Sequence, residues 1–406
     1  MATCIAADRG VVNQRIAVPA GFMALVASFV ALAPLSTDFY LPVLPSMSLA
    51  LDASASQAQL VITAVLLGMA LGQLVGGPLS DQRGRRGTLI AGLVGFVLTT
   101  ALSAVAPSIG TLIAIRFASG LAVALVFVVS RAMVADVYPG IESARAFALL
   151  GSITGITPVV APIIGGLLAL AMDWRGIFWV LAGVGVLILV VAWVRVPETM
   201  PVHARQLSGV SHGLRDLGAC LRSRRFMTYV LTLAMAGGVL FAYISTSPFV
   251  LQDGYGLTPT QFSAVFAVNS VGLFAVALVS RRLVGTQGPV RLLWSGQVQA
   301  AIGSAIVLAG LLAHLLPVVL VGLLVAVSSV GIIFANSTAL GLQASPVRAG
   351  SASALLGISG FLVGGLLAPL GGLGSAALGV LMLGFALTGL LVHAFLKPRS
   401  PRTEGR

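Results

Sequence analysis

The sequence predicts an all-α integral membrane protein whose 12 transmembrane helices form two pseudo-symmetric bundles of six. The composition, a series of long apolar runs and the positions of the basic residues support this prediction. Of the 406 residues, 58% are hydrophobic and only 8% are charged, and the mean hydropathy is +1.06. A soluble domain carries about 25% charged residues, so this chain has too few to cover a water-facing surface.

Twelve apolar runs are long enough to cross a bilayer, because a helix needs about 20 residues to span a hydrocarbon core ~30 Å thick. We expect these helices at residues 17–44, 57–79, 88–106, 110–134, 145–171, 175–196, 226–250, 261–283, 290–313, 315–340, 351–371 and 374–396. A Gly-rich turn at residues 371–374 joins the last two. The first run is too long for a signal peptide, and many similar runs follow it.

The longest polar segment follows the sixth run and divides the chain into six plus six helices. We therefore predict an N-terminal tail at 1–16, an N-terminal bundle at 17–196, a central loop at 197–225, a C-terminal bundle at 226–396 and a tail at 397–406. Two such halves indicate an internal repeat of the kind found in secondary transporters. In the second run, Gly68, Gly72 and Gly76 recur every fourth residue, a spacing typical of close contact between membrane helices.

The basic residues predict the orientation in the membrane. Apart from Arg116 inside the fourth run and Arg175 in an alternate loop, they all lie on one side of the predicted helices. Cytoplasmic loops carry such an excess, so we expect both termini and the central loop in the cytosol. These loops account for the net charge of +12, and no basic face with interleaved aromatic residues indicates nucleic-acid binding.

Several function classes lack their sequence signals. Cys4 and Cys220 are too few and too far apart for a zinc site, and we place both in the cytosol, where disulfides are rare. The only lysine is Lys397, so no phosphate-binding loop ending in Gly-Lys exists to power an ATP-driven pump. No catalytic His-Glu-x-x-His or Gly-x-Ser-x-Gly motif occurs. We expect neither an enzyme nor a metal site.

Asp38 is the only acidic residue well inside an apolar run. A charge at membrane depth is costly and indicates function. Counted from the predicted run ends, Asp38 and Arg116 both lie roughly 9 Å below the outer interface, at 1.5 Å per residue. We therefore expect the two side chains to pair, with Asp38 binding the proton or competing with substrate and Arg116 tuning it, because burial and a nearby Arg act in opposite directions on a carboxyl group. The alternative is a static ion pair that fixes helix packing.

Polar or aromatic side chains inside the runs are candidates for a substrate cavity, since such sites combine apolar walls with a few oriented polar groups. The candidates are Tyr40, Gln73, Phe127, Tyr243, Asn269, Asn336 and Gln343. The alternative for each is a hydrogen bond between helices.

Residues 77–86 read GPLSDQRGRR and resemble the signature loop of the major facilitator superfamily. The candidate gating residues are Gly77, Asp81, Arg83, Gly84, Arg85, Arg86 and Asp136. Glycines allow a tight turn, Asp81 can face a helix N-terminus, and the arginines hold the loop on the cytosolic side. Gln82 stands where the family usually has Arg, and Arg83 follows one place later. We therefore expect the ion pair of the loop with its partner acid to be weaker, or to be formed by another arginine. The resemblance implies that Asp81 contacts the start of the eleventh helix, near Gly350 and Ser351, and that Asp136 pairs with the Arg of the loop.

Three further segments resemble the twelve-helix drug:proton antiporter branch of that superfamily. They are residues 116–120, the antiporter motif with Pro158, Pro162, Gly165 and Gly166, and residues 36–42, which match the Bcr/CflA subfamily. Shorter pieces typical of the subfamily occur at 131–136, 174–178, 197–199, 247–250 and 349–354.

The resemblance implies the major facilitator fold and proton-driven efflux of small antibiotics, with bicyclomycin- and chloramphenicol-type compounds as substrate classes. Its partners would be a small-molecule drug, a proton and the lipid bilayer of the bacterial inner membrane, with no cofactor and a monomeric chain. A proton-coupled importer or a facilitator of a small metabolite or sugar is the alternative on the same fold. The antiporter motif and Asp38 favour antiport. A channel is disfavoured, because the sequence has no filter-like loop and its two halves suggest alternating access.

Overall fold

The structure is a computed structural model that describes residues 19, 21–138, 140–200, 218–347, 349–367, 370, 374 and 376–395, and these contain helices but no strands. The elements are α1 (Phe22–Asp38), η1 (Leu41–Val43), α2 (Leu44–Ala50), α3 (Ala55–Arg83), α4 (Arg85–Ala104), α5 (Ile109–Val137), α6 (Gly140–Leu168), α7 (Trp174–Arg195), α9 (Arg224–Pro248), η3 (Phe249–Gly254), α10 (Pro259–Gln287), α11 (Pro289–Leu312), α12 (Leu316–Ala344), α13 (Ala349–Leu367) and α14 (Ala377–Phe395). The predicted all-helical fold is confirmed.

Every predicted run coincides with one helical segment. Within the described residues, 11 segments are long and apolar enough to cross a membrane, and α13, with 19 residues, occupies the position of the remaining run. The first segment differs most from its prediction, because it continues through η1 and α2 to Ala50 instead of ending at residue 44. The turn expected at residues 371–374 lies outside the described residues except for Gly374.

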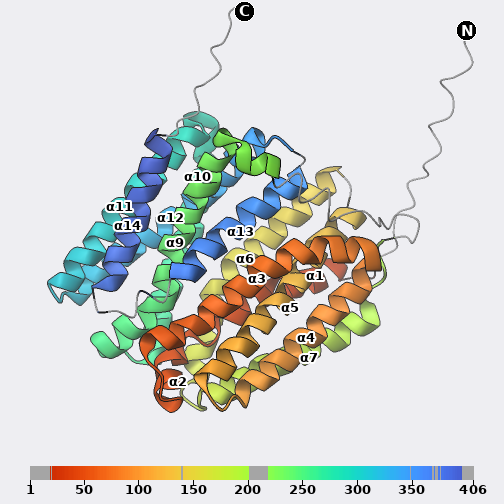
Figure 1. The fold of residues 1–406 in the computed structure, drawn as a ribbon, viewed down its shortest axis with the longest axis horizontal. Helices are drawn as coiled ribbons and strands as arrows, with labels where there is room; N and C mark the ends of the chain where they lie inside the picture. The colour runs from red at the N-terminus through yellow and green to blue at the C-terminus, as the bar shows by residue number, and fades with distance from the viewer. Residues whose placement is uncertain are drawn as a thin grey trace, which may run out of the picture.

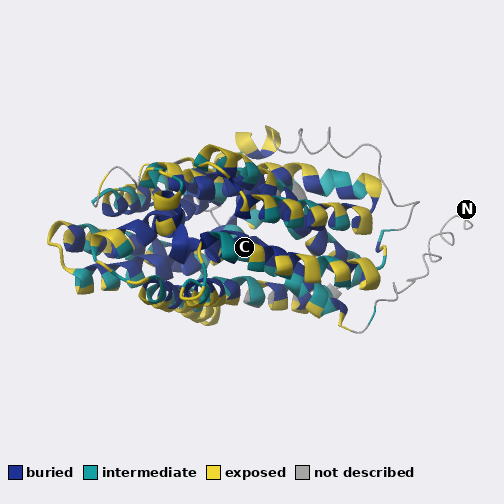
Figure 2. Cartoon of the chain, turned by 90° about the horizontal axis from the view of Figure 1, so that it is seen from below, coloured by how far each residue is buried: buried dark blue, intermediate teal, exposed yellow. Residues whose placement is uncertain are grey.

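The helices form two bundles, α1 to α7 in one and α9 to α14 in the other (Figure 1). Across the junction between them, α3 packs on α13 and α6 packs on α10. Buried residues gather in the interior of the molecule, and exposed ones lie on the outer faces (Figure 2). Many exposed side chains are large and apolar, such as Leu98 and Leu187, as lipid-facing surfaces require.

The two halves repeat the same local devices. Helices α3 and α10 both have 29 residues, and a capping box closes the start of each, with Ser54 and Gln57 in α3 and Thr258 and Gln261 in α10. Each helix ends at a glycine with positive φ, where a side chain would be strained: +96° at Gly84 and +77° at Gly288. Thr258 follows Ser54 by the same number of residues as Gly288 follows Gly84, which indicates an internal repeat.

The predicted close helix contact is formed between α3 and α5. A methyl group on Gly68 would overlap the carbonyl oxygen of Phe117, and one on Gly120 would overlap the carbonyl oxygen of Val65. Gly72 likewise lies against Ala124. The small residues therefore allow the two backbones to touch, and α5 holds Arg116 in a fixed position within the first bundle.

Candidate functional site

Asp38 is the last residue of α1, and the helix ends there because a proline follows four residues later. Pro42 has no N–H group to donate to the carbonyl of Asp38, so the next helical hydrogen bond cannot form. The Asp38 side chain is 4% exposed, and its Oδ1 accepts a hydrogen bond of 2.8 Å from Thr37 Oγ1. In the described part of the chain, Asp38 forms no ion pair. Its carboxylate therefore lies buried at a helix break without a fixed cation.

Arg116 lies in α5 with its side chain fully buried (0% exposed). Its Nη2 donates to the carbonyl and the hydroxyl of Ser36, and its Nη1 donates to Ser119 Oγ at 3.2 Å. The guanidinium carbon lies 5.0 Å from the ring centre of Tyr40 and 5.4 Å from that of Phe178. Two aromatic faces and three oxygen acceptors thus hold this cation.

The expected ion pair between Asp38 and Arg116 is absent from this conformation, as judged over the described residues. Helix geometry explains this. Ser36 and Tyr40 are four residues apart and share the face of the chain that meets Arg116, whereas Asp38 lies two residues from Ser36, about 200° around the helix. Equal depth in the membrane therefore did not put the two charges on the same face.

The break after Asp38 packs against the second bundle, because η1 contacts both α9 and α10. Asp38 lies within electrostatic reach of Tyr243 on α9 as well as of Tyr40 in its own bundle. The Tyr243 hydroxyl accepts a hydrogen bond of 3.0 Å from Asn269 Nδ2 on α10. The ring of Tyr243 stacks on Phe266, with the ring centres 5.2 Å apart. The structure thus combines the acid of the first half with a polar and aromatic group of the second half at the junction of the bundles.

Two other substrate candidates lie on α3 and α5. Gln73 on α3 lies beside Gly357 on α13, where its Oε1 is 3.6 Å from the position of a Cβ atom, and its Nε2 has no hydrogen-bond partner among the described groups. Phe127 on α5 lies under the guanidinium of Arg131, at 5.6 Å from its carbon.

The remaining candidates have different surroundings. Tyr40 packs against Phe178 within the first bundle, with the ring centres 5.2 Å apart. Asn336 on α12 donates to Ser280 Oγ on α10 at 2.9 Å, which is the helix-to-helix hydrogen bond considered as the alternative. Gln343 is exposed near the end of α12. Tyr40 therefore belongs to the surroundings of both Arg116 and Asp38, whereas Asn336 and Gln343 have other surroundings.

The prolines of the antiporter motif create a contact between the bundles. Pro162 has no N–H, so the carbonyl of Pro158 is left without a helical donor. The hydroxyl of Ser270 on α10 shares its proton between this oxygen, at 3.3 Å, and the carbonyl of Phe266 in its own helix, at 2.9 Å. A helix-breaking residue in α6 thus provides an acceptor for the opposite half.

The glycines of the same motif allow close approach on two sides of α6. A methyl group on Gly165 would overlap the carbonyl oxygen of Phe39, at the break after Asp38. A methyl group on Gly166 would overlap the hydroxyl of Ser263 on α10. Helix α6 is therefore in contact with both the broken end of α1 and the second bundle.

Two glutamines link the bundles close to the break in α1. Gln252 Nε2, in η3, donates to the carbonyl of Pro42 at 3.1 Å. Gln59 Nε2, in α3, lies 3.5 Å from Thr246 Oγ1 in α9. Both contacts hold the two bundles together beside the break in α1.

The loop between α3 and α4 is organised around Arg85, whose side chain is 8% exposed. Its Nη1 contacts Asp81 Oδ1 at 2.5 Å and Ser80 Oγ at 2.6 Å, and its Nε pairs with Asp136 Oδ2 of α5 at 3.0 Å. Arg83 is exposed and makes no ion pair within the described ranges. The ion pair with Asp136 is thus formed by Arg85. This agrees with the expectation that a different arginine takes this role when Gln82 replaces the usual one.

Glu198, just beyond α7, caps the start of α4. Its carboxylate accepts hydrogen bonds from the backbone N–H of Arg85 at 2.9 Å and of Arg86 at 3.3 Å, two donors that a helix start leaves free. Gly84 provides the positive φ of the turn, and the Gly77 carbonyl accepts from Ser80 Oγ at 2.9 Å. The loop is therefore fixed from both sides.

The implied contact of Asp81 with Gly350 and Ser351 falls on side chains outside the described part of the chain. Among the described residues, no group of three or more His, Cys, Asp or Glu side chains could hold a metal ion.

We expect Arg85→Gln to destabilise the protein more than Arg83→Gln, although both remove one positive charge from the same loop. Removing one partner of a largely buried pair leaves two carboxylates without their cation, at a cost of about 1–3 kcal/mol. The measurement is the thermal unfolding midpoint of each purified variant in detergent. Equal midpoints for the two variants would contradict the assignment of the grip to Arg85.

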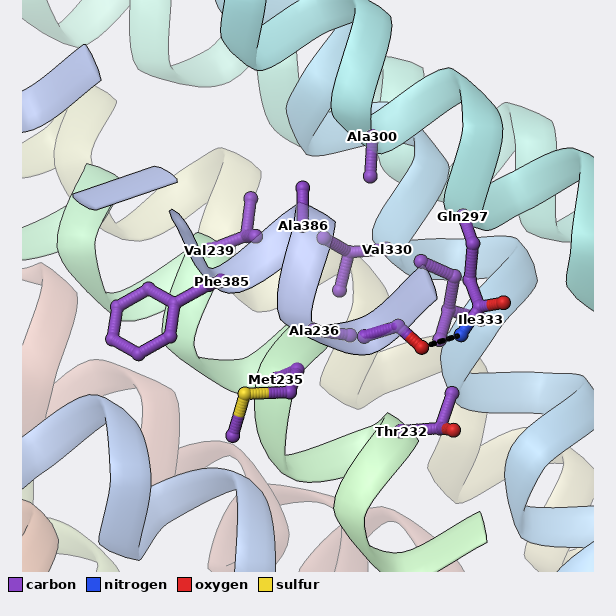
Figure 3. A pocket seen from close by; sticks show the side chains of 11 residues that line it. Thr232, Met235, Ala236, Val239, Gln297, Ala300, Val330, Ile333, Phe385 and Ala386 are labelled. Carbon is purple, nitrogen blue, oxygen red and sulfur yellow. Dashed lines mark hydrogen bonds between the residues drawn. The ribbon is translucent and has the colours of Figure 1, made fainter. Parts of the chain in front are cut away.

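A small enclosed cavity of about 10 Å³ lies inside the second bundle, between α9, α11, α12 and α14 (Figure 3). Thr232 and Gln297 are the polar side chains on its wall, and Gln297 Nε2 donates to the carbonyl of Gly389 at 3.0 Å. This volume holds about one water molecule. None of the predicted substrate residues lines the cavity, so it is distinct from the group around Asp38.

The sequence patterns did not single out Gln59 or Gln252, and Phe178 appeared only as part of the subfamily segment at 174–178. That segment did not indicate that Phe178 stacks on Arg116, because Phe is common in apolar runs. The two glutamines did carry a signal, because each is an uncharged polar residue near the end of an apolar run, from where it can form a hydrogen bond to a neighbouring helix.

Comparison with known proteins gives a consistent family match. Residues 26–369 match the model of the Major Facilitator Superfamily. The chain is 36% identical over 373 residues to the MFS-type transporter YdgK of Bacillus subtilis (strain 168), which covers 90% of this chain and 93% of YdgK. It is 29% identical over 384 residues to the multidrug resistance protein MdtL of Escherichia coli O6:K15:H31 (strain 536 / UPEC), which covers 93% of this chain and 96% of MdtL.

Solved structures share the arrangement of helices at low sequence identity. The nucleoside transporter NupG superposes with a TM-score of 0.76 at 10% identity, covering 93% of this chain and 100% of that chain. A D-xylose–proton symporter superposes with a TM-score of 0.72 at 16% identity, covering 95% of this chain and 99% of that chain. These likenesses concern the fold alone.

Proposed function

The chain belongs to the major facilitator superfamily of multi-pass membrane transporters, and from this premise we propose that it is a proton-coupled exporter of small drug-like molecules. The observation that carries the proposal is Asp38, a buried acid without a fixed cation that lies at the junction of the two bundles. Similarity to a multidrug resistance protein over 93% of the chain supports export. Residues 36–42 further favour the Bcr/CflA subfamily, with bicyclomycin- or chloramphenicol-type substrates.

In this mechanism, Asp38 alternates between a proton and the substrate. A buried carboxylate without an ion pair is stabilised by either one, so binding of one favours release of the other. Arg116 lies on the opposite face of α1 and keeps the end of the helix positive without neutralising Asp38. Tyr243 and Asn269 provide a hydroxyl and an amide for orienting a substrate against the aromatic face of Phe266.

We place the protein in the bacterial inner membrane as a monomer, with the loop around Arg85 and both termini in the cytosol. The distribution of arginines supports this orientation. The contacts of Gln252 and Gln59 then close the periplasmic side, and alternating access requires that they break when the substrate is released.

Inside-out vesicles that contain the protein test the proposal directly. Under an imposed proton gradient, we expect uptake of chloramphenicol or bicyclomycin and no uptake of a panel of sugars. Gradient-driven movement of a sugar or metabolite in the opposite direction would instead support the importer. Antibiotic uptake that is the same with and without the gradient would contradict proton coupling.

We expect Tyr243→Phe to raise the KM for the exported compound about tenfold while proton coupling is retained. The substitution removes the hydroxyl that Asn269 binds and leaves a buried amide donor unpaired, a loss of about 1–3 kcal/mol. The measurement is initial uptake rate against substrate concentration in the same vesicles. Tyr255→Phe, which removes a half-buried hydroxyl 3.5 Å from the Gly310 carbonyl, is the matched control and should leave KM unchanged. Equal KM values for both variants would remove Tyr243 from the substrate site.

A further inference from the structure

An open apolar groove of about 380 Å³ lies between the start of α1 and the end of α7. Its walls are Leu25, Val190, Val191 and Val194, with Gly21 and Arg195 at one end. Val190 is 55% exposed and Val194 is 72% exposed, so the groove faces the surroundings of the bundle. A surface of this kind at membrane depth is covered by hydrocarbon.

The end of the groove is positively charged. Arg195 is the last residue of α7, is exposed and forms no ion pair within the described part of the chain. Arg86 Nη2 donates to the carbonyl of Trp193 at 2.8 Å, which brings a second exposed guanidinium to the same helix end. The nearest acid in sequence, Glu198, binds the backbone N–H groups at the start of α4. Two arginines therefore meet the headgroup region at this corner.

The position of Trp193 supports an interfacial location. Its ring is 60% exposed, beside the charged end of α7, and tryptophan is enriched where membrane helices pass from hydrocarbon to headgroups. The groove thus combines an apolar slot, an interfacial indole and guanidinium groups, in the order in which a phospholipid presents its chain, glycerol and phosphate.

We propose that this groove binds an anionic phospholipid, with one acyl chain along Leu25, Val190 and Val194 and the phosphate at Arg195. Guanidinium groups form paired hydrogen bonds to phosphate oxygens, and the cytosolic leaflet carries the anionic lipids. The proposal uses the cytosolic orientation given above but is independent of the transported substrate. The lipid would fasten the first helix of the first bundle to its last.

Native mass spectrometry of the purified full-length chain tests the binding. The protein is incubated with vesicles of equal parts phosphatidylglycerol and phosphatidylcholine and then extracted into mild detergent. We expect wild type to retain phosphatidylglycerol in preference to phosphatidylcholine. Arg195→Gln should reduce the retained phosphatidylglycerol about fivefold, the effect of one basic residue at an anionic surface.

Two further variants separate the groove from general surface charge. Val191→Trp fills the slot with an indole and should also reduce retention, without any change in charge. Arg282→Gln removes an exposed arginine from α10, away from the groove, and should have no effect. Equal retention by Arg195→Gln and Arg282→Gln, or equal retention of the two lipids, would overturn the proposal. Absence of retained lipid in wild type would also overturn it, because another segment of the chain or a second copy would then cover the groove.

Discussion

Asp38→Asn is expected to abolish gradient-driven transport, with the energised uptake rate in inside-out vesicles falling by at least about a hundredfold. Asparagine has nearly the same shape and can still accept the hydrogen bond from Thr37, but it cannot bind and release a proton. The buried carboxylate has no ion pair among the described residues, so removing its charge leaves no cation uncompensated. The expected loss is therefore one of coupling and not of folding.

Two controls make this result interpretable. Asp52→Asn changes an exposed acid between α2 and α3 whose φ is +50°, a conformation that asparagine also accepts, and should transport like wild type. Exchange of labelled for unlabelled substrate in the absence of a gradient should persist in Asp38→Asn if the protein is folded and still binds. Unaltered energised uptake by Asp38→Asn would reduce Asp38 to a packing residue and favour a facilitator.

The positions of the helices could be predicted because the bilayer restricts which residues a membrane-spanning segment can contain. A segment in hydrocarbon must be long and apolar and must satisfy its own backbone, so each helix is visible as a run. Asp38 stood out for the same reason, as the one acid inside such a run. The break after Asp38 was also encoded, by Pro42, but a hydropathy count treats the run as continuous and misses it.

The contacts around Arg116 and Asp38 could not be predicted from depth. The position of a residue along a helix gives its depth in the membrane. Its neighbours depend on the direction of the side chain around the helix axis, which changes by about 100° per residue. Ser36, Tyr40 and Phe178 hold Arg116 because of the rotation of α1 against α5 and α7, which only tertiary packing determines. The grip of Arg85 on Asp136 was similarly open, since several arginines of one loop could reach the same acid.

Gly165→Ala is expected to disrupt both stability and transport, and it has the largest effect expected for a single methyl group here. The added carbon would overlap the carbonyl oxygen of Phe39, a backbone atom that cannot rotate away. Overpacking of this kind costs about 1–3 kcal/mol, which lowers the unfolding midpoint of a chain of this size by about 1–4 °C. Because Phe39 follows Asp38, the displacement also moves the broken end of α1, so transport should fall further than the folded fraction does.

The matched control is Gly151→Ala in the same helix, where an added methyl group has no neighbour within 4 Å. Alanine favours helix over glycine by about 1 kcal/mol, so this variant should be at least as stable as wild type. The unfolding midpoint and the uptake rate per folded molecule distinguish the two positions. Similar values for both variants would mean that α6 does not press on the break in α1. A lower midpoint with normal uptake in Gly165→Ala would mean that the contact stabilises the bundle but takes no part in the movement around Asp38.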